Sequence, residues 1–215
     1  MTTDDPLYAA SALAGLFFWT ISYALIIRRS HLDRTWGMPF PALCTNLAYE
    51  FVFGFVHPLA SPGNYVNIVW FLVDLVIAAQ FLRYGQSALP EHFPKRLFFP
   101  AVGVCIAMAI GAALAFTADL GLLRGNSYLG WGGDFFLSAC FVALIHRREG
   151  VAGQSLWIAV TRMLGSWAII PAQEIEGTHA FVRLVYFCAP LLNFTYLYLY
   201  VKKCRALGVD PLRRV

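Results

Sequence analysis

Residues 97–117 read LFFPAVGVCIAMAIGAALAFT, an apolar run without a single charged side chain. A helix of about 20 such residues crosses the hydrocarbon core of a bilayer, because each residue adds about 1.5 Å to its length. The rest of the chain has the same character, since 59% of its 215 residues are hydrophobic and only 13% are charged. A soluble domain carries about 25% charged residues. The sequence therefore predicts an integral membrane protein.

Six further apolar runs flank this one, and short polar breaks with Pro and Gly residues separate them. A membrane span needs about 17 to 25 residues, and the second and sixth runs are the shortest. We predict an all-α bundle of seven transmembrane helices that forms one domain over residues 1–215. The predicted spans are residues 8–27, 41–56, 65–82, 97–117, 128–145, 156–170 and 181–201.

The Lys and Arg residues mark the two sides of this bundle. They gather in the breaks after the first, third and fifth runs and behind the seventh, whereas the opposite breaks hold Arg124 alone. Basic loops stay in the cytoplasm, so we expect the N-terminus outside and the C-terminus in the cytoplasm. The net charge of +4 is spread over short loops and forms no nucleic-acid-binding patch. The expected partner is the lipid bilayer, and the number of subunits stays open.

Several chemistries lack the residues that they need. The five cysteines have no CxxC spacing and no two of the five histidines stand at ligand spacing, so we predict no metal site and no cofactor. No aspartate-rich pair is present to hold magnesium diphosphate, which disfavours an intramembrane prenyltransferase. The lysines are Lys95, Lys202 and Lys203, none in the middle of a span, which excludes a retinal Schiff base.

Four ionisable residues stand well inside the predicted spans: Glu50, Asp74, Asp134 and Arg162. Each costs at least a few kcal/mol in hydrocarbon and is therefore a candidate functional residue. Asp74 or Asp134 could instead neutralise Arg162 in a buried ion pair that only holds helices together. Glu50 has no cation within its own span, which favours a functional role for it.

Polar and aromatic residues gather around these positions at helical spacing. Side chains three, four or seven residues apart share a face of a helix, so four spans each present one mixed stripe. Trp131 could also be an interfacial anchor, and the tyrosines of the last span could be packing residues. The stripes are Asn46, Tyr49, Glu50 and Phe53 in the second span, Asn67, Trp70 and Asp74 in the third, Trp131, Asp134, Phe135 and Ser138 in the fifth, and Tyr186, Asn193, Tyr196 and Tyr200 in the seventh.

The segment PALCTNLAYEFVFGFV (residues 41–56) resembles the N-x-x-W/Y-E-F pattern of the small membrane-bound terpene cyclases. Those enzymes belong to fungal meroterpenoid and indole-diterpene pathways and to bacterial drimentine-type indole sesquiterpene pathways. The next span is similar as well, with Trp70 and Asp74 spaced W-x-x-x-D. The short chain lacks the extensions of the fungal members, which favours the bacterial branch and a bacterial plasma membrane.

This resemblance implies that Glu50 is an essential acid. Fungal members also use an aspartate in the last span, where the best-matching segment here, LLNFTYLYLY (residues 191–200), carries Asn193. Either Asp74 or Asp134 then supports Glu50, or the substrate is an alkene rather than an epoxide.

The expected function is an acid-initiated, metal-independent cyclisation of a prenylated substrate, a farnesylated indole above all. Burial favours the neutral form of a carboxyl group, so Glu50 is expected to protonate the terminal alkene or epoxide, with Asp74 and Asp134 as supporting carboxyls. Asn46 is expected to donate a hydrogen bond to the carboxylate that forms. The alternatives are a proton-coupled transporter and a scaffold bundle. The residues expected to bind the substrate or stabilise its cation are Asn46, Tyr49, Phe53, Trp70, Trp131, Arg162, Tyr186 and Asn193.

Overall fold

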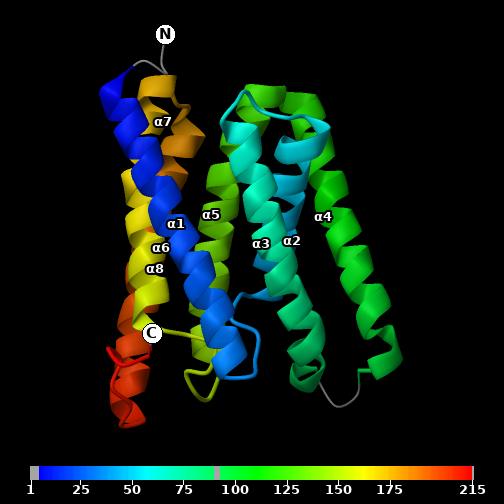
Figure 1. Ribbon diagram of the computed structural model, residues 1–215, viewed down its shortest axis with the longest axis vertical. Helices are drawn as coiled ribbons and strands as arrows, with labels where there is room; N and C mark the ends of the chain where they lie inside the picture. The colour runs from blue at the N-terminus through cyan, green and yellow to red at the C-terminus, as the bar shows by residue number, and fades with distance from the viewer. Residues whose placement is uncertain (1–4, 90–92, 215) are drawn as a thin grey trace.

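The computed structural model describes residues 5–89 and 93–214, and every regular element in those ranges is a helix (Figure 1). This confirms the predicted all-α class. Two 3₁₀ turns, Gly85–Ala88 and Lys95–Leu97, flank the connection between the third and fourth helices. The helices are α1 (Pro6–Leu32), α2 (Phe40–Phe51), α3 (Gly63–Tyr84), α4 (Phe98–Leu120), α5 (Leu122–Arg147), α6 (Leu156–Ala168), α7 (Ile170–Glu176) and α8 (Ala180–Ala206).

Each of the seven predicted runs corresponds to one helical segment. Five helices, α1, α3, α4, α5 and α8, are long and apolar enough to cross a membrane. The second run is α2 continued by a π-helical turn over Val52–Val56, and the sixth is α6 followed by the short helix α7. The exact membrane boundaries and the orientation of the termini stay predictions.

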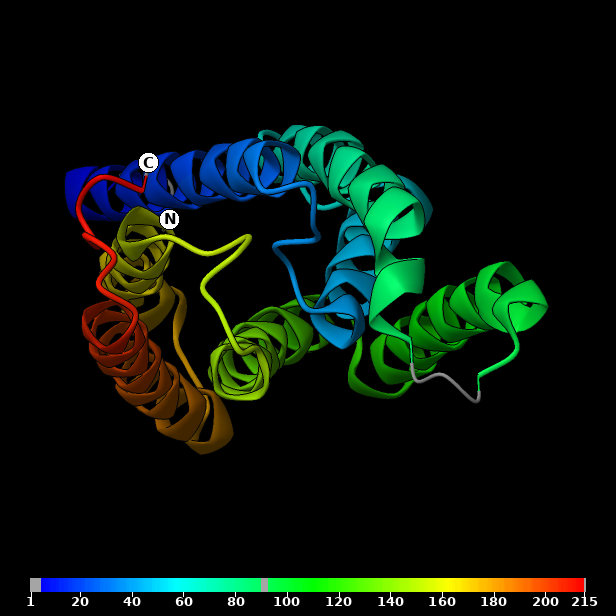
Figure 2. The same cartoon turned by 90° about the horizontal axis from the view of Figure 1, so that it is seen from below.

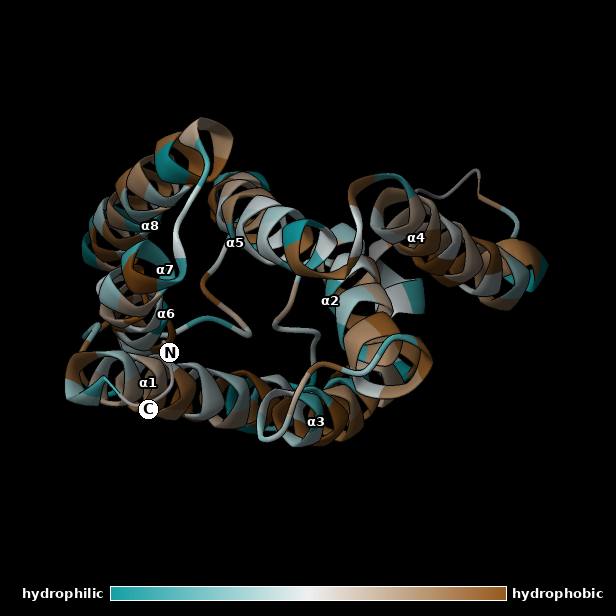
Figure 3. Ribbon diagram, turned by 90° about the horizontal axis from the view of Figure 1, so that it is seen from above, coloured by the Kyte–Doolittle hydropathy of each residue, from teal (hydrophilic) through white to brown (hydrophobic). Residues whose placement is uncertain are grey.

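Six of the segments form a closed ring. Around it, α1 contacts α6, α6 contacts α8, α8 contacts α5, α5 contacts α2, α2 contacts α3, and α3 returns to α1. Figure 2 shows this ring along its axis. The helix α4 lies outside it, against α2 and α5, as Figure 3 shows from the other end. The inner faces of six helices therefore point toward one shared interior.

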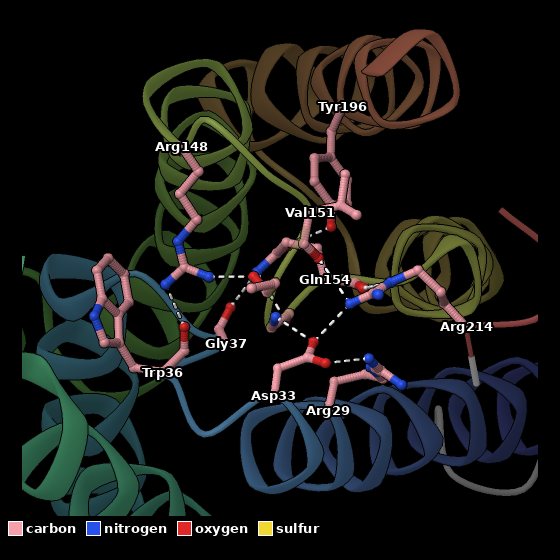
Figure 4. A network of polar contacts seen from close by, with 11 residues as sticks. Arg29, Asp33, Trp36, Gly37, Arg148, Val151, Gln154, Tyr196 and Arg214 are labelled. Carbon is pink, nitrogen blue, oxygen red and sulfur yellow. Dashed lines mark hydrogen bonds and ion pairs between the residues drawn. The ribbon is translucent and has the colours of Figure 1, made fainter. Parts of the chain in front are cut away.

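The end of the ring where α1 finishes is crossed by loops and held by charged side chains (Figure 4). The Asp33 carboxylate, just behind α1, pairs with Arg29 and accepts hydrogen bonds from Gly153 N (2.7 Å) and from Arg214 Nη2 (2.7 Å). Gln154 donates to the main-chain oxygen of Gly37 (2.8 Å). These contacts join the α1–α2 loop, the α5–α6 loop and the C-terminal tail. We call this group the polar closure.

Arg148, at the end of α5, completes the closure. Its guanidinium donates to the main-chain oxygen of Trp36 (2.5 Å) and lies 4.2 Å from the centre of that indole ring. Burial lowers the pKa of Arg148 from 12.5 to about 10, a shift that Asp33 partly opposes. Because that pKa remains well above 7, Arg148 stays a cation and keeps both contacts at neutral pH.

Replacing Asp33 with Asn is expected to destabilise the fold. The change removes the charge that two arginines and one main-chain N–H share, and hydrogen bonds to charged groups contribute about 1.5–3 kcal/mol each. We expect a thermal midpoint several degrees lower, measured by size-exclusion chromatography of heated, detergent-solubilised protein. Asp210→Asn is the control, because Asp210 pairs with the exposed Arg213 at the surface, where such pairs contribute little. Equal midpoints for the two variants would contradict a stabilising role for the closure.

Candidate active site

Glu50 lies on the inner face of α2 and is only 2% exposed. The Tyr23 hydroxyl of α1 donates a hydrogen bond to Glu50 Oε1 (3.2 Å), and Asn46 Nδ2 donates to the Tyr23 oxygen (2.7 Å). The expected hydrogen bond from Asn46 to Glu50 is therefore replaced by a chain that runs through Tyr23. Glu50 Oε2 has no hydrogen-bond partner within the described ranges.

Asp74, on α3, lies beside Glu50 and is fully buried. Its carboxyl neighbours the Glu50 carboxyl and the Asn46 amide, yet neither of its oxygens makes a well-aligned hydrogen bond to the part of the chain that the structure describes. We call Glu50 and Asp74 the carboxyl pair.

A π-helical turn, Val52–Val56, begins two residues after Glu50. Such turns are rare and often occur at functional sites, because they widen the helix and shift the side chains that follow. Phe53 lies within this turn, is fully buried, and packs against Tyr49 with their ring centres 4.9 Å apart. The turn thus buries Phe53 against Tyr49 and Ala113 of α4.

Trp70 and Tyr49 are also held in place by hydrogen bonds. The Trp70 indole donates to Thr20 Oγ1 (3.3 Å), and its ring lies 6.1 Å from that of Tyr23. The Tyr49 hydroxyl donates to Asn126 Oδ1 of α5 (2.7 Å). Trp70 thus lies beside Tyr23, the hydrogen-bond partner of Glu50. Tyr49 reaches α5, whereas Phe53 packs toward α4.

A second polar group lies between α5, α6 and α8, and we call its members, Asp134, Ser138, Arg162 and Asn193, the Arg162 cluster. Arg162 is fully buried and donates through Nη2 to Ser138 Oγ (3.0 Å). Ser138 in turn donates to Asn193 Oδ1 (3.2 Å). Asp134 Oδ1 lies 4.0 Å from Arg162 Nη2. Of the two aspartates proposed to neutralise Arg162, the structure brings Asp134 to it and places Asp74 beside Glu50.

Two residues of α1 connect the cluster with the carboxyl pair. Arg162 lies 5.7 Å from the Trp19 ring, and the Trp19 and Tyr23 rings lie 6.3 Å apart. Neither Trp19 nor Tyr23 was expected from the sequence. Their four-residue spacing in the first span is the signal that would have found them, because it places both on one helix face.

Trp131 and Tyr186 form a third group near α7. The Trp131 indole donates to Gln173 Oε1 (2.8 Å), the Tyr186 hydroxyl donates to Glu174, and the two rings lie 5.2 Å apart. Among the residues with described positions, no hydrogen bond or ring contact joins them to Glu50. The expected site residues thus fall into three groups rather than one.

No three His, Cys, Asp or Glu side chains of the described residues lie close enough together to hold a metal ion. The carboxyl pair has only two members. Within the described residues, its one hydrogen bond is the bond from Tyr23 to Glu50.

The chain is similar to known proteins over most of its length. The sequence model described as Pyr4-like transmembrane terpene cyclases matches residues 6–204. The chain is 26% identical to the Pyr4-family terpene cyclase mfmH of Annulohypoxylon moriforme, over 92% of this chain and 88% of that protein. It is 30% identical to asnovolin H synthase nvfL of Aspergillus novofumigatus, over 77% and 70%. It is 29% identical to terpene cyclase pyr4 of Aspergillus fumigatus, over 75% and 68%.

No solved structure matches the chain. The relatives named above are all fungal, so they give no support to the expected bacterial plasma membrane, whereas an integral membrane protein is supported. Because the family match covers almost the whole chain, the protein is a member of the Pyr4-like transmembrane terpene cyclases.

Proposed function

We propose that Glu50 protonates the terminal alkene of a prenylated substrate, a farnesylated indole for preference, and so starts a cation–olefin cyclisation. The observation that carries this proposal is the buried Glu50 carboxyl on the inner face of the ring, with one oxygen unpaired within the described chain and Asp74 beside it. The second candidate substrate is the terminal epoxide, in which Glu50 would deliver the proton to the epoxide oxygen.

Tyr23 stabilises the carboxylate that Glu50 becomes. Asn46 donates to the Tyr23 oxygen, so the single hydroxyl proton of Tyr23 is left to point at Glu50 Oε1. A donor fixed in this way before the reaction costs no reorganisation when the negative charge develops. Asp74 holds the Glu50 proton in place or shares it, and Asn46 acts as a positioning residue.

The carbocation is stabilised by aromatic faces. Trp70 packs on Tyr23, and Tyr49 and Phe53 stand next to Glu50 along α2. Each ring that faces the cation contributes about 0.5–2 kcal/mol of cation–π attraction. Trp131 and Tyr186 lie in the separate group near α7 and are proposed to meet a more distant part of the substrate. A dry interior keeps water from adding to the cation.

The reaction is balanced as an isomerisation. Protonation adds one hydrogen to the CH carbon of the terminal alkene and leaves a tertiary cation, the ring-closing alkenes move the charge along the chain, and loss of one proton at the end restores a neutral product. Reaction in D₂O is therefore expected to add one carbon-bound deuterium to each product molecule.

The test is made on membranes that contain the protein, incubated with a farnesylated indole in D₂O. Mass spectrometry counts the added deuterium, and proton NMR counts the alkene hydrogens that remain. One deuterium on the former alkene CH supports protonation of an alkene. A product from the epoxide with no carbon-bound deuterium supports delivery of the proton to oxygen. If alkene and epoxide substrates both emerge unchanged, the proposed function is wrong.

A further inference from the structure

The Arg162 cluster has more hydrogen-bonding atoms than its own members use. Arg162 Nε and Nη1 and Asn193 Nδ2 are buried donors without a partner in the described ranges. Both Asp134 oxygens are buried acceptors that also lack a partner in the described ranges. The 4.0 Å between Asp134 Oδ1 and Arg162 Nη2 is too long for a hydrogen bond. Buried polar atoms are normally paired, so this group of unpaired donors and acceptors points to a missing partner.

Neighbouring hydroxyls do not supply that partner. Ser138 accepts a hydrogen bond from Arg162 and donates one to Asn193 Oδ1. The NH₂ group of Asn193 is therefore left without a partner in the described ranges. Ser166 lies beside Asp134, but its hydroxyl donates its one hydrogen bond to the main-chain oxygen of Arg162 (3.1 Å). The serines orient the cluster without satisfying it.

The chemistry of Arg162 is unsuited to a carbocation. A guanidinium repels a positive charge, and the repulsion is weakly screened in a low-dielectric interior. The Phe141 ring centre lies 4.2 Å from the guanidinium carbon and the Trp19 ring centre 5.7 Å. Because these rings lie against the guanidinium, a ligand can meet only the N–H groups at its edge. Those groups are hydrogen-bond donors and require an acceptor such as oxygen.

Resting on the proposed function, we infer that the Arg162 cluster binds a secondary amide on the non-terpenoid part of the substrate. Arg162 and Asn193 donate to the amide oxygen, and Asp134 accepts the amide N–H. A secondary amide carries one donor and one acceptor on neighbouring atoms, which complements the free donors of α6 and α8 and the free acceptor of α5. Trp19 and Tyr23 connect this group with the carboxyl pair, so the two sites take opposite ends of one elongated molecule.

The test compares two farnesylated indoles of equal length. Farnesylated N-acetyltryptamine carries the amide, and farnesylated 3-pentylindole replaces it with methylenes. A site with buried hydrogen-bonding groups rejects an analogue that leaves them unpaired. For the wild type we expect a kcat/KM about 100-fold higher for the amide, on the scale of such discrimination. Asn193→Leu is expected to reduce this ratio at least about 10-fold, because only the amide loses a hydrogen-bond donor.

Control variants and a binding measurement decide the remaining outcomes. Thr195→Val, on the exposed side of α8, is expected to keep the wild-type ratio. Asp134→Asn removes the proposed carboxylate acceptor together with the charge beside Arg162, and is also expected to lower the ratio. Equal use of both substrates by the wild type overturns the inference, as does an equal loss on both in Asn193→Leu. Preference for farnesylated tryptophol over the amide overturns it in favour of a hydroxyl ligand.

Binding of the same pair to purified protein, followed by isothermal titration calorimetry, gives an answer without turnover. Tighter binding of the amide that Asn193→Leu abolishes supports the inference even if neither compound is cyclised, in which case only the proposed function fails. Equal binding of the two compounds overturns the inference by itself.

Discussion

Glu50→Gln is expected to lower kcat for cyclisation by at least about 100-fold, since a positioned general acid contributes about 10²–10⁴-fold to a rate. Glutamine keeps the length and shape of the side chain, and its amide oxygen can still accept the Tyr23 hydroxyl. It has no acidic proton to give. Because the substrate contacts are unchanged, we expect KM to stay within about threefold of the wild type, the pattern of an interaction made only in the transition state.

The measurement is product formation on membranes, normalised to the amount of folded protein in each preparation. Glu149→Gln is the matched control, since it makes the same chemical change on an exposed loop residue and is expected to leave kcat unaltered. A Glu50→Gln enzyme with near-wild-type kcat would remove Glu50 from the role of acid and move the search to Asp74 and Asp134.

Asp74→Asn is expected to lower kcat by about 10- to 100-fold, with the larger part of the effect acting through Glu50. Asn fills the same space beside Glu50 and Asn46, but it cannot share a proton with Glu50. Interacting carboxyls titrate as a pair, so the shape of the pH–rate profile is expected to change in the variant. A purely structural role for Asp74 would lower the amount of folded protein without altering that shape.

Asp119→Asn, at the exposed end of α4, is the control for this variant. Combining Asp74→Asn with Glu50→Gln is expected to cost little more than Glu50→Gln alone, because residues that act as a unit are not additive. Fully additive losses would mean that the two carboxyls work separately.

The sequence was sufficient for the helices and for the faces that they bury. Apolar length predicts a span because the bilayer fixes the length of a helix, and the seven runs correspond to helical segments for that reason. Helical spacing also predicted which residues of one span share a buried face, as with Tyr186, Asn193, Tyr196 and Tyr200 of α8. Both predictions rest on local geometry, which one helix contains within itself.

Partners on different helices could not be derived in this way. Nothing in a single sequence states that Asp74 faces Glu50 while Asp134 faces Arg162, because that depends on the order of helices around the ring. The same limit applies to Tyr23. Its oxygen accepts the hydrogen bond that Asn46 was expected to donate to Glu50. The break between α6 and α7, at Ile169 and Ile170, lies within one apolar run and was not visible from hydropathy.

The position of α4 outside the ring has an evolutionary consequence. The carboxyl pair and Tyr23 come from α1, α2 and α3, whereas the Arg162 cluster comes from α5, α6 and α8, and α4 is the helix that joins these halves. On the roles proposed above, recombination within α4 would exchange the recognition half of one cyclase for that of another and keep the acid half, provided that the contacts of α1 with α6 and of α2 with α5 still fit. New substrates then become accessible to this family by shuffling of halves as well as by point mutation.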